Sequence, residues 1–121
     1  MKKKNYPWSK PIGETNHYHV YADKYPVTEG HLLFIPKEDL EEHIAKCFEG
    51  AYKQGQALVK EGFCDGYNVG MNMGKDAGQT VMYPHIHFIP RREGDLGRFE
   101  NGTAYDPTGG VRNIFPGKGK Y

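Results

Sequence analysis

Alternation of hydrophobic and polar positions, together with short apolar runs, predicts four β-strands. Residues 17–22 alternate and are rich in aromatic side chains, while residues 31–35 are almost wholly apolar and end at Pro36. Residues 67–72 and 83–89 are two further candidate strands, and the second of them alternates clearly. A period of two is typical of a strand with one face against a core, and β-branched and aromatic residues favour it.

An amphipathic helix is predicted between the second and third strands. Its apolar or small residues recur at three- and four-residue spacing, and they are Leu40, Ile44, Cys47, Phe48, Ala51, Gly55 and Leu58. Gly62 suits the C-terminal cap, whereas Gly50 and Gly55 mark either a break or a close packing contact. Strands, a helix, strands and a tail in this order indicate the α+β class with a largely antiparallel sheet.

Length and composition favour one domain over residues 1–121. Within it we distinguish an N-terminal extension, 1–13, and a glycine-rich tail, 94–121. We expect the tail to be irregular but docked, because it carries the apolar residues Tyr105, Val111, Ile114, Phe115 and Tyr121.

Charge and cysteine content narrow the partners and the compartment. A formal net charge of +1 gives no reason to expect nucleic acid or a membrane as a partner. The basic residues 2–4 are not followed by the apolar stretch of a signal peptide, and no run reaches membrane-spanning length. Cys47 and Cys64 lack a Cys-x-x-Cys spacing and are most simply reduced thiols. We therefore expect a cytoplasmic protein.

The most informative stretch for chemistry is the last predicted strand and the loop before it. His85 and His87 fall on one face of that strand, just after a loop that holds Gly70, Gly74 and Gly78. Glycines allow backbone N–H groups to approach an anion closely. Two imidazoles beside an anion-binding loop favour attack on phosphorus.

A histidine pair on a strand is weak evidence by itself, because the same pattern occurs at His17 and His19 without a glycine loop. We expect that first pair to be structural or to lie at the rim of a site. A metal site would combine both pairs, as in cupin-like barrels, since imidazole is a common metal ligand. The chain lacks a carboxylate at fixed spacing and the six or more short strands of such a barrel, so we expect neither a metal nor another cofactor.

Three other features are ambiguous or negative. Asp23 follows the first strand, where a carboxylate can bind a ribose diol or cap a turn, and the turn is the commoner case. His31 opens the second strand and is equally ambiguous alone. The segment from Gly70 to Lys75 is no P-loop, because three residues separate its glycines and Asp76 follows the lysine.

Taken together, these motifs resemble the histidine triad (HIT) superfamily of nucleotide hydrolases and transferases. The resemblance runs from about Glu14 to Tyr121. Its segments are Asp23-x-x-Pro-Val-x-x-Gly-His31, Leu33-Phe-Ile-Pro-Lys37, Gly66-Tyr-Asn-Val-Gly-Met-Asn72, Gly78-Gln-Thr-Val81, Pro84-His-Ile-His-Phe-Ile-Pro-Arg91 and the tail Gly109-Gly-Val-Arg-x-x-x-Pro-x-Lys-x-x-Tyr121. Each segment alone is common, but the ordered set is specific.

The resemblance implies both a fold and an activity. The fold is a five-stranded, mostly antiparallel sheet with a helix on one face, paired into a ten-stranded sheet in a homodimer. The activity is hydrolysis or transfer at the α-phosphate of a nucleotide substrate, with purines favoured, through a nucleotidyl-histidine intermediate. A non-catalytic nucleotide-binding module of the same fold is the alternative.

The resemblance also assigns roles, residue by residue. It implies that His85 is the nucleophile, His87 the third histidine of the triad and His31 an additional histidine of the site. Phosphate binding falls to Asn72, Gln79 and Thr80, and nucleoside binding to Tyr21, with Ala22 beside it, and to Asp23.

The first position of the triad is occupied here by Tyr83. A phenol with an ordinary pKa of about 10 does not exchange protons readily at pH 7. Pro84 removes a backbone donor before His85, although the related galactose-1-phosphate uridylyltransferases also place proline before their nucleophilic histidine. Tyr83 therefore bears on the leaving group and the rate more than on the location of the site.

Overall fold

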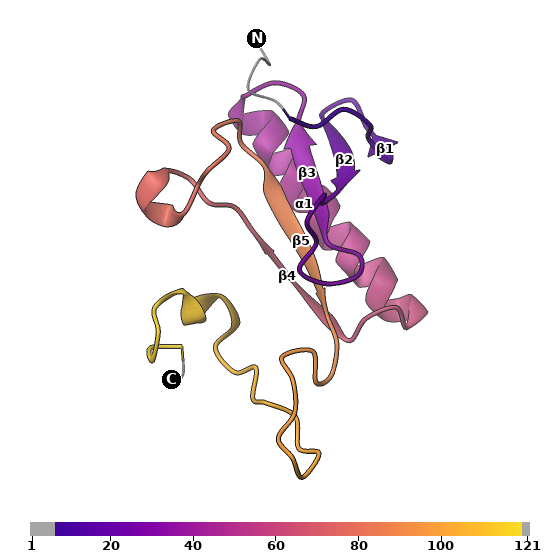
Figure 1. The fold of residues 1–121 in the computed structure, drawn as a ribbon. Helices are drawn as coiled ribbons and strands as arrows, with labels where there is room; N and C mark the ends of the chain where they lie inside the picture. Colours follow the sequence, from indigo (N-terminus) through magenta and orange to yellow (C-terminus); the bar gives the residue numbers. More distant parts are fainter. Residues whose placement is uncertain (1–6, 120–121) are drawn as a thin grey trace.

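The structure is a computed structural model that describes residues 7–119. Five strands form one antiparallel sheet in the order β1-β2-β3-β5-β4, and a single α-helix packs on one of its faces (Figure 1). The elements are β1 (Gly13–Glu14), β2 (Tyr18–Ala22), β3 (Leu32–Pro36), α1 (Glu41–Glu61), β4 (Gly66–Gly70) and β5 (Ile86–Arg91), with 3₁₀ turns η1 (Lys75–Ala77) and η2 (Gly110–Ile114). This confirms the predicted α+β class and the five-stranded sheet.

The main disagreement in secondary structure lies at the last predicted strand, 83–89. In the structure β5 begins at Ile86, and its pairing with β3 begins where Phe34 faces Ile86. Pro84 has no N–H to give to a strand ladder, so the segment before β5 is irregular. Of the histidine pair, His87 therefore lies within the strand and His85 immediately precedes it.

Helix α1 is continuous, and its glycines mark close packing contacts rather than a break. A Cβ on Gly50 would lie 2.2 Å from the Tyr18 hydroxyl, and one on Gly55 would lie 2.4 Å from the Tyr67 ring. Only glycine allows the sheet residues to approach the helix so closely. Gly62 caps the helix in the left-handed conformation, as predicted.

Side-chain alternation along the strands separates two apolar layers. On the helix side, Phe34, Ile86 and Phe88 pack with Cys47 and Ala51 of α1. On the opposite side, a second cluster contains Tyr21, Leu33, Ile35 and Tyr83, with Trp8 packed against it. The histidine of β5 shares the parity of this second side, so the sheet presents it away from the helix.

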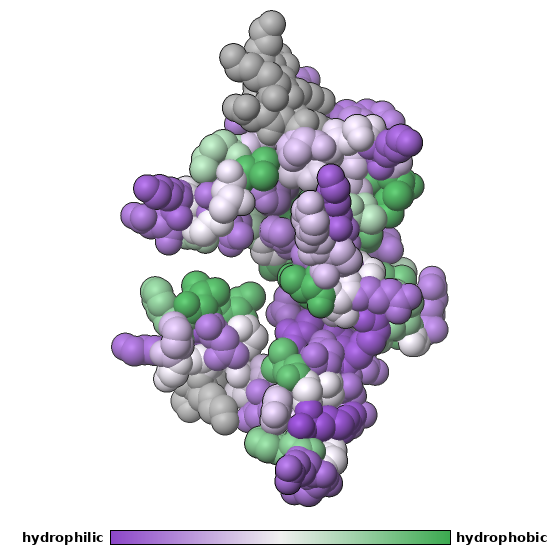
Figure 2. Space-filling model, in the orientation of Figure 1, coloured by the Kyte–Doolittle hydropathy of each residue, from purple (hydrophilic) through white to green (hydrophobic). Residues whose placement is uncertain are grey.

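The C-terminal segment does not dock as expected. In Figure 1 it stands apart from the sheet, and Figure 2 shows hydrophobic residues on it that border a hollow. Val111, Ile114 and Phe115 are 62–78% exposed, and Tyr105 contacts Phe99 within the tail itself. The expected tail residue Tyr121 lies outside the described residues. Packing within the tail alone therefore leaves its apolar side chains uncovered.

Two further sequence expectations concern the cysteines and membranes. Cys47 and Cys64 are buried and unpaired, as predicted. Burial raises the pKa of the Cys47 thiol to about 12, so this thiol stays protonated and inert. Among the described residues, no helix has both the length and the apolar character needed to cross a bilayer.

Candidate active site

A cavity of about 500 Å³ brings most of the sequence-predicted site residues together. The predicted residues that line it are Asp23, Asn72, Gln79, Thr80, His85 and His87. His31 is buried behind the cavity, where its ring contacts His87. Segments separated by more than sixty positions in the sequence thus converge on one site.

Hydrogen bonding fixes the orientation and tautomer of His85. Its Nδ1 lies 2.9 Å from the backbone carbonyl oxygen of Tyr83, two residues earlier. A carbonyl can only accept a hydrogen bond, so Nδ1 carries the proton and Nε2 holds a lone pair. The ring is 8% exposed and lies 5.2 Å from the His87 ring. Nε2 of His85 therefore offers a lone pair at the cavity.

A chain of hydrogen bonds fixes the tautomer of His87. The Val27 N–H donates to Nδ1 of His31 at 3.1 Å, so the proton of a neutral His31 ring is on Nε2. That Nε2–H lies 2.9 Å from Nδ1 of His87, which accepts it. The proton of His87 is then on its own Nε2. His87 is a hydrogen-bond donor beside the lone pair of His85.

The rings of His31 and His87 are both neutral at pH 7. Burial lowers the pKa of His31, although the nearby carboxylate of Asp23 opposes the shift. Burial also lowers the pKa of His87, and the rings of His85 and His31 lower it further. Protonation of either ring would place a donor against a donor. The arrangement of donors and acceptors is therefore stable above the ordinary histidine pKa of about 6.5.

Asp23 has a place in both a turn and the site. Its Oδ1 accepts the Tyr25 N–H at 2.8 Å, which is an Asx-turn bond, and its Oδ2 lies 3.3 Å from Nε2 of His31. The side chain is 16% exposed and lines the cavity. A carboxylate has about four lone-pair positions, so these two contacts leave acceptor capacity for hydroxyl groups of a ligand.

Asp23, His31 and His87 also bring three potential metal-ligand atoms within 4.8 Å of one another, the only such group among residues 7–119. A metal on Nε2 of His31 would require the ring proton on Nδ1, where it would face the Val27 N–H. The donor pattern does not fit a metal ion. Nor is the four-histidine site assembled, because His17 contacts Glu42, and His19 contacts Glu14.

In the polar loop before β5, the side-chain donors of Gln79 are used within the loop itself, which the sequence did not indicate. The side-chain amide of Gln79 accepts the Gly74 N–H at 2.7 Å and donates to the carbonyls of Val81 and Met82. The Gln79 N–H bonds to Gly74 as well. Gln79 therefore shapes the loop and has its donors engaged, so the expected donation to phosphate from this residue is not prepared. The exposed residues Asn72 and Thr80 remain the polar groups of the loop that face the cavity.

Two tyrosines that the sequence associated with the site lie beside it. Tyr83 is 6% exposed, and its hydroxyl donates to the Pro36 carbonyl at 2.7 Å. Burial raises the pKa of Tyr83 to about 12, so its side chain stays protonated while its backbone orients His85. Tyr21 is buried, with its ring 6.3 Å from that of Trp8. Neither tyrosine lines the cavity.

Sequence reasoning missed several residues that complete the cavity wall. They are Pro7, Trp8, Lys24, Tyr25, Leu33 and Val81. Trp8 is the most informative, because its ring lies 5.3 Å from that of His85. The available signal was a single tryptophan in a polar N-terminal extension, although no local pattern connects it to a strand about eighty positions later.

Comparison with known proteins identifies the family. The family model described as HIT domain matches residues 7–94, from the first described residue to the start of the tail. The chain belongs to the HIT family. A HIT-like protein of Methanocaldococcus jannaschii, whose function is uncharacterised, is 37% identical over 94 residues, which cover 72% of each chain.

The relatives of this HIT protein include proteins that are named as enzymes. The asymmetrical bis(5′-nucleosyl)-tetraphosphatase of Schizosaccharomyces pombe is 30% identical over 87% of this chain and 63% of its own length. The adenosine 5′-monophosphoramidase of Saccharomyces cerevisiae is 37% identical over 66% of this chain and 52% of its own length. The matches therefore span less than two thirds of both enzymes. The HIT family includes nucleotide hydrolases.

Solved structures agree with the fold. A zinc-bound histidine triad family protein from Mycobacterium smegmatis superimposes with a TM-score of 0.65 at 33% identity, covering 80% of this chain and 73% of that one. The Caenorhabditis elegans NitFhit protein gives a TM-score of 0.62 at 38% identity, covering 73% of this chain and 23% of that one. The zinc belongs to the mycobacterial protein, and the hydrogen bonds of His31 argue against carrying it over to the present site.

Proposed function

We propose that this protein is a nucleotidyl hydrolase or transferase that acts at the α-phosphate of a nucleoside phosphate derivative, with a purine base favoured. The observation that carries the proposal is the pairing of opposite tautomers. His85 presents a lone pair on Nε2, while His87 presents a proton on Nε2, and both rings border one cavity. A nucleophile beside a fixed donor is what attack on a phosphate anion requires.

In the proposed reaction, Nε2 of His85 attacks the α-phosphorus, and the bond from phosphorus to the leaving group breaks with its electron pair on that group. His87 donates to a nonbridging oxygen as charge develops there. Water, or another acceptor hydroxyl, then attacks the nucleotidyl-His85 intermediate. The nucleotide product leaves, His85 regains its lone pair, and the proton of the acceptor passes to solvent.

Steady turnover of a fluorogenic adenosine phosphoramidate tests this proposal. We expect product release with a covalent nucleotidyl adduct on His85, detected by rapid-quench mass spectrometry. The alternative is a non-catalytic nucleotide-binding module, which the protonated Tyr83 at the first triad position favours. Nucleotide binding without adduct or product would support the module and overturn the enzyme.

We also propose that the protein is a homodimer with a continuous ten-stranded sheet. β4 is an edge strand of the described sheet, and proteins usually pair or cover such edges. The tail in addition exposes Val111, Ile114 and Phe115. A second copy of the chain would pair the edge and offer a surface for these side chains.

The cytoplasm remains our proposed compartment. Cys47 and Cys64 are both unpaired, which fits a reducing environment.

Nucleotide affinity is expected to depend on Asp23. If its carboxylate accepts both ribose hydroxyls, Asp23→Ala should weaken the binding of AMP or GMP by about 1.5–3 kcal/mol, the range for hydrogen bonds to a charged group. A dideoxyribose nucleotide should lose much less. Calorimetry on the two ligands measures the difference, and equal losses would show that Asp23 serves only its turn and His31.

Replacing Tyr83 separates stability from chemistry. Tyr83→Phe removes the buried hydrogen bond to Pro36 and should lower the free energy of unfolding by about 1–2 kcal/mol. Turnover should stay near the wild-type rate, because the Tyr83 carbonyl still orients His85. Urea unfolding and kinetics are compared with Tyr105→Phe, a change at an exposed tyrosine. A loss of turnover with unchanged stability would place the Tyr83 hydroxyl in the reaction.

A further inference from the structure

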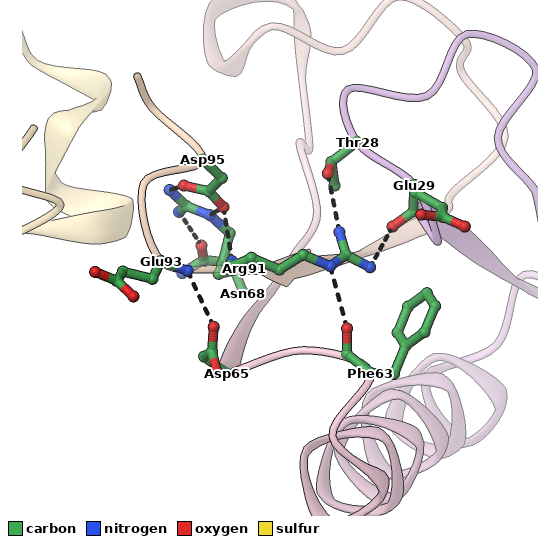
Figure 3. A network of polar contacts seen from close by, with 9 residues as sticks. Thr28, Glu29, Phe63, Asp65, Asn68, Arg91, Glu93 and Asp95 are labelled. Atoms are coloured by element: carbon green, nitrogen blue, oxygen red, sulfur yellow. Dashed lines mark hydrogen bonds and ion pairs between the residues drawn. The ribbon is translucent and has the colours of Figure 1, made fainter. Parts of the chain in front are cut away.

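The guanidinium of Arg92 joins segments that lie far apart in the sequence. Its Nε donates to the Phe63 carbonyl just beyond α1, its Nη1 to Oγ1 of Thr28 and its Nη2 to the Glu29 carbonyl, each at 3.1 Å. The three partner residues are labelled in Figure 3. The guanidinium also lies over the Phe63 ring, 4.6 Å from its centroid. Arg92, the residue directly after β5, thus fixes the loop 24–30 to the end of the helix.

The loop 24–30 is the segment that sets the proton of His31. The backbone N–H of Val27 donates to Nδ1 of the His31 ring, and the backbone N–H of His31 donates to the Thr28 carbonyl at 3.2 Å. The loop also fits closely against Phe63, because a Cβ on Gly30 would lie 2.8 Å from that ring. A displacement of Thr28 or Glu29 would move the neighbouring Val27 N–H away from the imidazole.

We infer that Arg92 is a positioning residue for the active site, acting through the loop 24–30 on the tautomers of His31 and His87. By holding Thr28 and Glu29, it keeps the Val27 N–H on Nδ1 of His31. Nε2 of His31 then donates to His87, and His87 keeps its own proton on Nε2, the donor that the proposed reaction uses. The part of the inference that concerns catalysis rests on the proposed function. The part that concerns tautomers does not.

Arginine suits this position because its planar fork carries five N–H donors in a fixed geometry and stacks on an aromatic ring. A lysine keeps the charge, but its compact ammonium cannot reproduce the planar arrangement of three acceptors. Arg92→Lys should therefore retain only part of the effect.

The neighbouring Arg91 provides a matched control. Its guanidinium bonds to Asp95 at 2.9 and 3.0 Å and to Oδ1 of Asn68 at 2.7 Å (Figure 3). Asp95 and Asn68 thus lie outside the loop 24–30, whereas Arg92 has two partners within it. Arg91→Gln and Arg92→Gln therefore remove similar numbers of hydrogen bonds from adjacent positions.

Nitrogen-15 NMR of the histidine rings tests the inference directly. In the wild type and in Arg91→Gln, His31 and His87 should both show the proton on Nε2 alone. In Arg92→Gln, both rings should show exchange between the two tautomers. The value of kcat should fall about 10–100-fold, by analogy with the removal of a group that orients a metal ligand. KM should change far less, and Arg92→Lys should lie between.

Failure of the inference about Arg92 can be distinguished from failure of the proposed function. Unchanged tautomers in Arg92→Gln would overturn the inference. It would also be overturned if Arg91→Gln and Arg92→Gln lost kcat equally and each loss matched the fall in that variant's melting temperature. If Arg92→Gln does not fold, Arg92→Lys replaces it, and wild-type tautomers and kcat in that variant overturn the inference. A wild type that never forms product would overturn the proposed function, while the tautomers would still decide the role of Arg92.

Discussion

His85→Ala is expected to abolish the covalent nucleotidyl adduct and to lower turnover by on the order of 10⁴-fold or more, as removal of a catalytic nucleophile does in other covalent enzymes. The reason is that no other lone pair on a ring nitrogen of the cavity is available. Nδ1 of His87 is already occupied by its hydrogen bond from His31. Rapid-quench mass spectrometry and phosphoramidate kinetics measure the two effects.

The control for this variant is His17→Ala. His17 is a partly exposed histidine that lies outside the cavity lining and contacts Glu42. It should keep wild-type turnover, and both variants should keep the circular dichroism of the fold. Turnover by His85→Ala at the wild-type rate would remove His85 from the mechanism.

Local patterns predicted the elements that a buried face dictates. β3 carries Leu33 and Ile35 toward one apolar layer and Phe34 toward the other, so its continuous apolar run follows from burial on both faces. The three- and four-residue spacing of apolar residues predicts α1 for the same reason, because one stripe of the helix packs on the sheet. β1 was missed, because two residues are too few to show a period.

Contacts between distant residues were beyond such patterns. Alternation along the chain predicts that Tyr83 continues the strand of His85 and His87, but its hydroxyl donates to the carbonyl of Pro36, forty-seven positions away. The bond between His31 and His87 joins residues fifty-six positions apart. No periodicity of a single chain encodes such a pair. The resemblance to a family is what assigns these residues to one site. The tautomers of the histidines depend on hydrogen bonds that only the three-dimensional structure shows.

The expected role of Gln79 in phosphate binding stays a prediction, and the hydrogen bonds of its side chain bear on it. A glutamine in a glycine-rich loop has the donors that a phosphate needs, and the residue type alone favours that role. In the structure, the same donors satisfy the carbonyls of Val81 and Met82. Loops place many backbone groups at the surface of a site, so a side chain that orders them competes with ligand binding for the same hydrogen bonds.

His87→Ala should reduce turnover by on the order of 10²–10³-fold, by analogy with the removal of one donor from an oxyanion hole. The variant loses the Nε2–H donor beside the lone pair of His85 but retains the nucleophile. The adduct on His85 should therefore still form, only more slowly, which distinguishes this variant from His85→Ala. Rapid-quench measurement of the adduct gives the rate of this step.

His87→Gln is the matched variant, because its amide keeps an N–H donor while losing the imidazole. We expect its rate of adduct formation to lie between those of His87→Ala and the wild type. Burial lowers the pKa of His87, so the donor remains neutral at pH 7, and the loss should be the same from pH 7 to pH 8. Adduct formation by His87→Ala at the wild-type rate would show that the transition state does not use this donor. A loss confined to pH below 6.5 would instead indicate that the protonated ring is the active form.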